Sequence, residues 1–266
     1  MYETYWGMTE KPFQNTPDPK FLYRSAACEE ALSRLLFVVH EGLGAALLTG
    51  VFGCGKTLII QALVDSLGAG FKVGVVTNPA LSGTELVREI TYQLGRKSQL
   101  PMTKTELLHV LEEVTLNNLR DGKRTVVVVD EAHLIEEPTA FEELRLLLNL
   151  QSRNAFLVTL ILAGQPELQA TVDANKPLAQ RIGLRFHLDH LTREETAGYV
   201  LHRLQVAGRT TPIFTPEALD AIYDTSGGIP RRINHVCGMS LLIGFQRQLT
   251  AIDDGVVREG GKELVG

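Results

Sequence analysis

Residues 50–57 limit the possible folds of this chain more than any other part of its sequence, because they read GVFGCGKT. Glycines, a lysine and a threonine at this spacing match the phosphate-binding loop G-x-x-x-x-G-K-[ST]. The apolar run AALLT at 45–49 precedes the loop as a predicted strand, and residues 55–67 follow it as a predicted helix. This order predicts an α/β nucleotide-binding domain, since loop N–H groups and the helix N-terminus both attract phosphate.

The residue types of the loop suit a nucleoside triphosphate and Mg²⁺. The Lys56 ammonium is expected to reach the β- and γ-phosphate oxygens, and the Thr57 hydroxyl is expected to bind Mg²⁺. Cys54 stands at a position that tolerates many residues, so we interpret its thiol as incidental to the chemistry. The predicted nucleotide contacts in the loop are Gly50, Gly53, Cys54, Gly55, Lys56, Thr57 and Leu58.

A second motif ends the continuous β-branched run TVVVVD at 125–130. Such a run predicts a strand that is buried on both faces. Ligands of parallel α/β sheets bind at the carboxyl ends of the strands, where this run places Asp130 and Glu131. We expect Asp130 to hold Mg²⁺ through water and Glu131 to polarise the attacking water as a general base.

The same motif reads DEAH from Asp130 to His133, which is also the box of some helicases. Those helicases need two tandem domains of this type, and 266 residues leave room for one domain and a small helical unit. The helicase interpretation is therefore discounted. His133 is interpreted as a local hydrogen-bonding or coupling residue and not as a catalyst.

Polar side chains outside these motifs are further candidates. Gln165 follows the apolar run 156–163 and is expected to contact the γ-phosphate or the attacking water. Arg181 and Arg185 precede the helical region, and either is a candidate arginine finger for the nucleotide site of a neighbouring copy. Arg231 opens a predicted helix directly after a proline, and we expect its guanidinium to reach the γ-phosphate.

The order of apolar segments predicts the fold class, an α/β P-loop parallel sheet followed by a small all-helical lid. Strands are predicted at 45–49, 71–77, 125–130 and 156–163. Helices are predicted at 26–41, 55–67, from Ser82 or Thr84 to about 94, and then at 104–120, 138–151, 192–207, 215–224, 231–247 and 251–264. Thr192 with Glu195, and Thr215 with Pro216, are expected to begin two of these helices. The predicted domains are an extended segment packed on the core at 1–25, the nucleotide-binding domain at 26–190 and the lid at 191–266.

Composition narrows the protein class further. The net charge of −5 excludes a strongly basic histone-like binder, and the 44% apolar content excludes wholesale disorder. Cys28, Cys54 and Cys237 are far apart and odd in number, which disfavours a disulfide framework or a zinc site and fits a reducing cytoplasm. No signal-peptide pattern is present, and no apolar run reaches the ~18 residues that cross a bilayer. We expect a cytoplasmic protein without an integral membrane segment.

Three further stretches resemble the ExeA/GspA-like family of general secretion AAA+ ATPases. They are WGM, KPF, TPDP and FLY within 6–23, GQPEL at 164–168 with QRI at 180–182, and GGIPRRIN at 227–234. The resemblance implies a RecA-like core with a helical lid, ATP as the nucleotide, its hydrolysis to ADP and phosphate, and an ATP-dependent homo-oligomer. The residues that it assigns are Lys56, Thr57, Asp130 and Glu131 as Walker positions, Gln165 as sensor 1, Arg181 as finger and Arg231 as sensor 2.

Two main functions stay open at this point. The first is an ATPase that remodels a protein assembly such as a secretion system or pilus. Secretion members of the family continue into a transmembrane helix and a peptidoglycan-binding region, whereas this sequence ends at Gly266 without either, which disfavours this function. The second is an ATP-dependent regulator of transposition, similar to the TnsC and TniB type, that binds duplex DNA. The acidic net charge disfavours DNA, while a basic rim is conceivable from Lys97, Lys104, Lys123 and Arg124. A slow nucleotide-gated scaffold is a third possibility, which the intact Glu131 disfavours.

Overall fold

The computed structural model describes residues 2–95, 102–152 and 155–262, and the chain divides into two compact units. The α/β unit comprises Glu29–Phe52 and Ile59–Leu188. The helical unit comprises Met1–Cys28, Gly53–Leu58 and Asp189–Gly266. Within the described residues, no helix combines the length and the apolar character that crossing a membrane requires.

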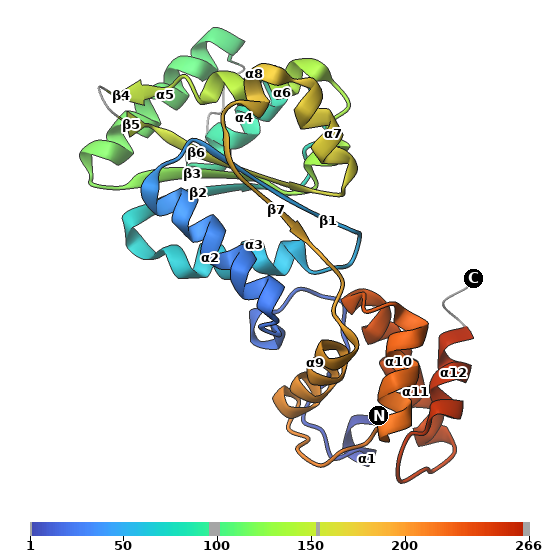
Figure 1. Cartoon of the computed structure of the whole chain (residues 1–266). Helices are drawn as coiled ribbons and strands as arrows, with labels where there is room; N and C mark the ends of the chain where they lie inside the picture. The colour runs from blue at the N-terminus through green and yellow to red at the C-terminus, as the bar shows by residue number, and fades with distance from the viewer. Residues whose placement is uncertain (1, 96–101, 153–154, 263–266) are drawn as a thin grey trace. The chain divides into compact units, whose positions relative to one another are not determined.

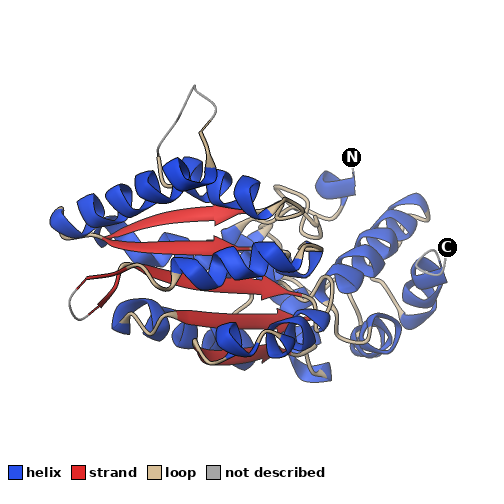
Figure 2. Cartoon of the chain, turned by 90° about the horizontal axis from the view of Figure 1, so that it is seen from above, coloured by secondary structure: helices blue, strands red, loops and turns tan. Residues whose placement is uncertain are grey.

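A five-stranded sheet forms the centre of the α/β unit (Figures 1 and 2). Its strand order is β2-β3-β6-β1-β7, and every neighbouring pair is parallel. The strands are β1 (Ala45–Gly50), β2 (Phe71–Val76), β3 (Arg124–Val129), β6 (Val158–Gly164) and β7 (Ile182–Leu188). Thr49 pairs with Gly164, and Val129 pairs with Leu162, so the carboxyl ends of the three central strands are nearly level.

Helices cover both faces of this sheet, which explains why its central strands are apolar on both sides. Figure 1 shows α4 to α8 on one face and α2 with α3 on the other. Every residue of β1 and β6 is buried. The helices are α2 (Ala26–Glu41), α3 (Lys56–Leu67), α4 (Gly83–Gln93), α5 (Lys104–Arg120), α6 (Pro138–Leu147), α7 (Glu167–Ala174) and α8 (Lys176–Ala179). The predicted fold class is confirmed.

The structure adds elements that the hydrophobic pattern did not predict. β7 is a fifth strand at the edge of the sheet, and it pairs with β1 alone. Because one edge and parts of its faces stay accessible, its residues are mostly half-buried and do not form an apolar run. A short antiparallel pair, β4 (Gln151–Ser152) and β5 (Ala155–Phe156), follows α6, which ends at Leu147 and not near 151 as predicted.

Side-chain caps set the starts of several helices. Thr192 and Glu195 form the predicted capping box of α9 (Arg193–Val206), each side chain accepting the backbone N–H of the other. Thr215 caps α10 (Pro216–Ser226) ahead of Pro216, also as predicted. Of the two candidates for the start of α4, Ser82 is the cap, because its hydroxyl accepts the Glu85 N–H. The hydrogen bonds from Ser82 in turn lower the pKa of the Glu85 carboxyl.

The helical unit has a core of its own. It contains α1 (Tyr2–Tyr5), α9 (Arg193–Val206), α10 (Pro216–Ser226), α11 (Pro230–Gln246) and α12 (Asp254–Gly261), with a 3₁₀ turn at Pro19–Phe21. Trp6, Met8 and Phe13 belong to the hydrophobic core that these helices form. The Trp6 indole N–H donates to the Leu241 carbonyl oxygen at 3.0 Å. The N-terminal segment is therefore not a loose extension, because its aromatic side chains complete the core of the helical unit.

Arg203 joins the N-terminal segment to α9. Its Nε donates to the Pro12 carbonyl oxygen at 2.5 Å, its Nη2 to the Gln14 carbonyl oxygen at 3.0 Å and its Nη1 to the Tyr199 hydroxyl at 2.8 Å. The guanidinium also lies 4.6 Å from the centre of the Phe21 ring. Only 4% of Arg203 is exposed, so a buried charge is compensated by three hydrogen bonds and an aromatic face.

We expect Arg203→Ala to lower the free energy of unfolding of the helical unit by about 3 kcal/mol, because buried carbonyl groups lose a charged donor. Urea unfolding, followed by Trp6 fluorescence, measures this change. Arg193→Ala is the matched control, since Arg193 is an α9 arginine that pairs with Asp220 and Asp224 at the surface. Exposed ion pairs contribute little, so the control is expected to unfold like the wild type. Equal destabilisation by both variants would contradict the anchoring role of Arg203.

Candidate active site

The loop between β1 and α3 has the backbone that its glycines predict. Gly53 has a φ of 82° and Gly55 a φ of 107°, in the left-handed region that glycine enters without steric cost. α3 begins at Lys56, which is 5% exposed, with its Nζ 3.9 Å from the Cys54 Sγ. Side chains larger than hydrogen at both glycines would strain this turn, so the loop conformation depends on its sequence.

Arg231 lies against this loop within the helical unit. Its backbone N–H donates to the Gly53 carbonyl oxygen at 3.2 Å, in the first turn of α11. A Cβ atom at Gly53 would lie 2.6 Å from the Cβ of Arg231. Glycine at 53 is therefore needed for conformation and for close packing. The sequence predicts a nucleotide contact for the Arg231 guanidinium, whereas this backbone contact with Gly53 leaves no signal in the sequence.

The two acids of the DEAH tetrapeptide follow β3 in the α/β unit. The Asp130 N–H donates to the Val76 carbonyl oxygen at 2.9 Å, which extends the pairing of β3 with β2 by one residue. Asp130 is 3% exposed, and its Oδ1 accepts the Glu131 N–H at 2.9 Å. Glu131 has a φ of 52°, an unusual left-handed conformation for a residue with a Cβ. Such backbone conformations cluster at functional sites.

His133 connects Glu131 with Gln165. The His133 Nδ1 lies 3.4 Å from the Glu131 Oε2 and 3.3 Å from the backbone nitrogen of Gln165. The His133 Nε2 lies 2.8 Å from the carboxamide of Gln165. Gly164 permits this approach, because a Cβ there would lie 3.1 Å from the backbone nitrogen of His133 and 2.8 Å from the Leu168 Cδ2. The structure thus brings together a predicted base, a predicted sensor and the histidine interpreted as a coupling residue.

The two candidate fingers occupy different environments at β7. Arg181 directly precedes the strand, and its Nη2 donates to the Asn149 Oδ1 at 2.6 Å. The other terminal nitrogen, Nη1, is buried and has no hydrogen-bond partner among the described residues. Arg185 lies within β7 and forms an ion pair of 2.6 Å with Asp173.

Two of the residues named for a basic rim, Lys104 and Arg124, have partners within the chain, while Lys123 is exposed. Lys104 is paired with the buried Glu143, and Arg124 donates to the His40 carbonyl oxygen. Lys97 lies outside the described residues. Of the candidates with described positions, two thus have partners within the chain, which weakens the case for a phosphate-binding rim.

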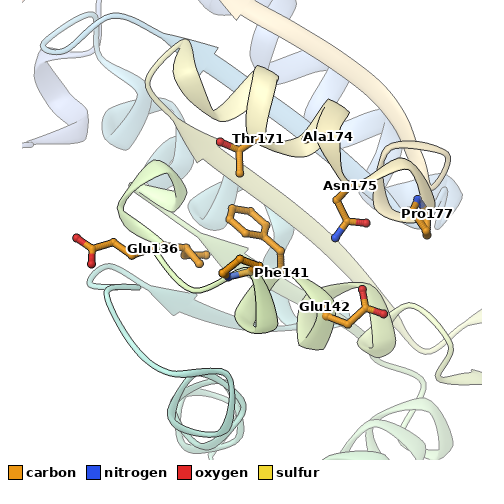
Figure 3. Close-up of a pocket in the computed structure, with 9 residues that line it drawn as sticks. Glu136, Phe141, Glu142, Thr171, Ala174, Asn175 and Pro177 are labelled. Atoms are coloured by element: carbon orange, nitrogen blue, oxygen red, sulfur yellow. The ribbon is translucent and has the colours of Figure 1, made fainter.

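A separate pocket of about 630 Å³ lies in the α/β unit beside α6, α7 and α8 (Figure 3). Phe141 forms part of its apolar wall, while Glu136 and Glu142 add two carboxylates. Its described lining includes none of the predicted nucleotide-contacting residues. The pocket is therefore separate from the candidate active site.

The donor set fits a nucleotide with Mg²⁺. The left-handed backbone at Gly53 and Gly55 shapes the loop, and the buried Lys56 supplies a cation directly after these glycines. The Thr57 hydroxyl and the Asp130 carboxylate are oxygen donors of the kind that Mg²⁺ prefers. No group of three or more His, Cys, Asp or Glu side chains among the described residues could hold a metal ion.

A family model described as "AAA domain" matches residues 39–172, which is half of the chain and includes both motifs. The chain belongs to the AAA domain family. Over its whole length this AAA protein is 40% identical to General secretion pathway protein A of Aeromonas hydrophila, and it spans 49% of that relative. The predicted ExeA/GspA-like membership is thus confirmed, and the chain is an AAA+ ATPase related to that protein, about half of whose length it covers.

Solved structures support the fold of this AAA protein. CDC6P from Pyrobaculum aerophilum matches with a TM-score of 0.76 at 18% identity, covering 95% of this chain and 70% of the other. The Aeropyrum pernix ORC2 protein in its ADPNP-ADP complexes matches with a TM-score of 0.71 at 19% identity, covering 96% and 71%. At such low identity these likenesses establish the architecture alone.

Proposed function

We propose that this chain binds ATP with Mg²⁺ and hydrolyses it to ADP and phosphate. The observation that carries the proposal is the geometry of the sheet edge in the α/β unit. β1 leads into the glycine loop at Gly50, and β3 ends at Asp130 and Glu131, at the same carboxyl edge of one parallel sheet. This is the edge at which α/β sheets bind ligands.

Each predicted residue has a defined role in this proposal. The Lys56 ammonium binds the β- and γ-phosphate oxygens. Thr57 and, through water, Asp130 hold Mg²⁺, whose charge offsets the negative charge of the phosphates. Glu131 polarises the attacking water as general base, because a carboxylate accepts the proton that the water loses. Gln165 contacts the γ-phosphate through its carboxamide, and Arg231 reaches the same phosphate.

We further propose that ATP binding drives assembly of a homo-oligomer that remodels a protein partner in a secretion or pilus type assembly. The support is the 40% identity over the whole chain with General secretion pathway protein A. Arg181 is the preferred finger, since Arg185 is held by Asp173 in an ion pair, whereas the described side-chain partner of Arg181 is the neutral Asn149. An ATP-dependent, duplex-DNA-binding regulator of transposition is the alternative.

Mass photometry of Glu131→Gln without nucleotide, with ADP and with ATP tests the assembly step. We expect larger species with ATP only, because the trapped triphosphate keeps the assembled state populated. Arg181→Ala in the Glu131→Gln background is expected to reduce the amount of these larger species. Arg185→Ala in the same background is the matched comparison and is expected to leave their amount unchanged. Identical mass distributions under all three conditions would overturn ATP-driven assembly.

Binding of the same Glu131→Gln protein to a fluorescent 40-mer duplex decides between the two functions. Anisotropy that rises only with ATP and falls as salt is raised would establish the DNA function, because phosphate contacts release counterions. Absence of binding at low salt, with ATP-dependent oligomers present, would support the protein-remodelling function.

A further inference from the structure

We infer that His133 is a positioning residue that couples the γ-phosphate contact of Gln165 to the freedom of Glu131, through the tautomeric state of its imidazole. The inference deepens the proposed function and rests on it. All three residues lie in the α/β unit, at the ends of the neighbouring strands β3 and β6. The imidazole lies within reach of both partners, so it is placed to pass a hydrogen-bonding change from one to the other.

The Nδ1 atom of His133 has two neighbours that make opposite demands. The Gln165 backbone N–H, at 3.3 Å, needs an acceptor, whereas the Glu131 Oε2, at 3.4 Å, needs a donor. A neutral imidazole has one N–H and one lone pair, so Nδ1 serves only one of these neighbours at a time. The choice at Nδ1 also fixes the opposite role for Nε2.

Two complete arrangements follow. In the first, Nδ1–H donates to Glu131, and Nε2 accepts from the carboxamide nitrogen of Gln165, which lies 2.8 Å away. In the second, Nδ1 accepts the Gln165 backbone N–H, and Nε2–H donates to the carboxamide oxygen after the amide has turned by half a rotation. The two arrangements differ in one proton position and one amide orientation, and only the first holds the Glu131 carboxylate.

A terminal phosphate selects between these arrangements, because its oxygens are acceptors. In the ATP state of this relay, the Gln165 carboxamide turns both N–H donors of its NH₂ group to the phosphate oxygens, and its oxygen then faces His133. That orientation requires Nε2–H, which leaves Nδ1 as an acceptor for the Gln165 backbone. Glu131 then loses its donor and is released to act on water. ATP would thereby free its own general base, while ADP would leave Glu131 held by His133.

Packing keeps the imidazole in place while the proton position changes. The His133 side chain is only 12% exposed. The backbone of Gly164 packs so closely against His133 that a Cβ atom at position 164 would lie 3.2 Å from the His133 Nδ1. The left-handed Glu131 turns the chain so that its carboxylate and the imidazole two residues later lie on the same side. The relay therefore needs no backbone movement, only a tautomer change and an amide rotation.

The tautomer itself is the direct measurement. The full chain, labelled with ¹⁵N-histidine and sedimented for magic-angle-spinning NMR, is compared with ADP and with a non-hydrolysable ATP analogue; the method does not depend on oligomer size. The chain has 7 histidines, and the spectrum of His133→Gln identifies the His133 signals by subtraction. We expect the N–H nitrogen to be Nδ1 with ADP and Nε2 with the analogue. The same tautomer in both states would overturn the relay.

Kinetics provide a second, independent measurement. His133→Ala is expected to lower kcat for ATP by about ten- to hundred-fold, with KM within about two-fold, because the Gln165 carboxamide loses the N–H that orients it toward the phosphate, and misplacement of a catalytic group costs a factor of this size. The double variant His133→Ala, Gln165→Ala is expected to be no slower than Gln165→Ala, because both changes break one relay. His109→Ala, an exposed histidine of α5, is the matched control and should equal the wild type.

Failure of the relay and failure of the proposed function give different results. A folded wild-type chain that does not hydrolyse ATP would remove the proposed function and the relay with it. If the wild type hydrolyses ATP, two results would remove the relay alone. One is a kcat of His133→Ala within about two-fold of the wild type, and the other is a loss of kcat in the double variant that equals the product of the two single losses. Thermal unfolding of each variant shows whether a lost activity reflects a lost fold.

Discussion

Replacing Lys56 by alanine is expected to weaken ATP binding by at least about a hundred-fold. A hydrogen bond to a charged group contributes about 1.5–3 kcal/mol, and the ammonium is proposed to contact two phosphate oxygens. Together these contacts correspond to about 3–6 kcal/mol, or roughly two to four orders of magnitude in Kd. Titration with a fluorescent ATP analogue in the presence of Mg²⁺ measures the loss.

Lys123→Ala is the matched control for Lys56→Ala. Lys123 is an exposed lysine in the turn before β3, so its removal changes the net charge equally and leaves the loop intact. Because Lys56 is buried, thermal unfolding without nucleotide must show that the variant is folded. Retention of ATP affinity within a few-fold in a folded Lys56→Ala chain would refute the assignment of the phosphate-binding loop.

Glu131→Gln is expected to reduce ATP turnover by about 10²–10⁴-fold while ATP affinity changes by no more than a few-fold. The amide has the size of the carboxylate but cannot take the proton of the attacking water, and positioned general bases contribute rate factors of about this size. Release of phosphate under saturating ATP measures kcat, and the fluorescent analogue measures affinity. A large loss of kcat without a loss of ATP affinity is what identifies a catalytic base.

Glu136→Gln is the control for the change of charge, since Glu136 is exposed and lines the separate pocket near α6. Turnover by this variant is expected to match the wild type. If Glu131→Gln keeps a kcat within about ten-fold of the wild type, Glu131 is not the base, because the lost contribution would be too small. Asp130 would then be the next residue to test.

Local sequence patterns were sufficient for the core of the fold. The β-branched run before Asp130 predicted β3, and the apolar run before Gly50 predicted β1, because strands buried on both faces need side chains of this kind. Capping pairs such as Thr192 with Glu195 predicted helix starts, since the hydrogen bonds that begin a helix join residues three apart. In each case the signal, an apolar run or a capping pair, lies within the segment itself.

The edge strand and the N-terminal segment depended on distant contacts. β7 has no continuous apolar run, and its strand conformation follows from pairing with β1, more than 130 residues earlier. Trp6 and Phe13 were recognisably too apolar for a free tail, yet only the packing shows that α9 to α12 supply their core. Burial against residues far along the chain leaves no periodic signal in the segment itself.

By itself, the sequence determined the family of this protein and predicted its chemistry, from a glycine loop with Lys56, acids after a buried strand, and a glutamine after another. Residue type and short spacing carry that information, because phosphate binding and proton transfer depend on particular functional groups in short motifs. Only the tertiary structure decided that the imidazole of His133 lies between Glu131 and Gln165. That contact exists because β3 and β6, which are separated by α6 along the chain, pair side by side in one sheet.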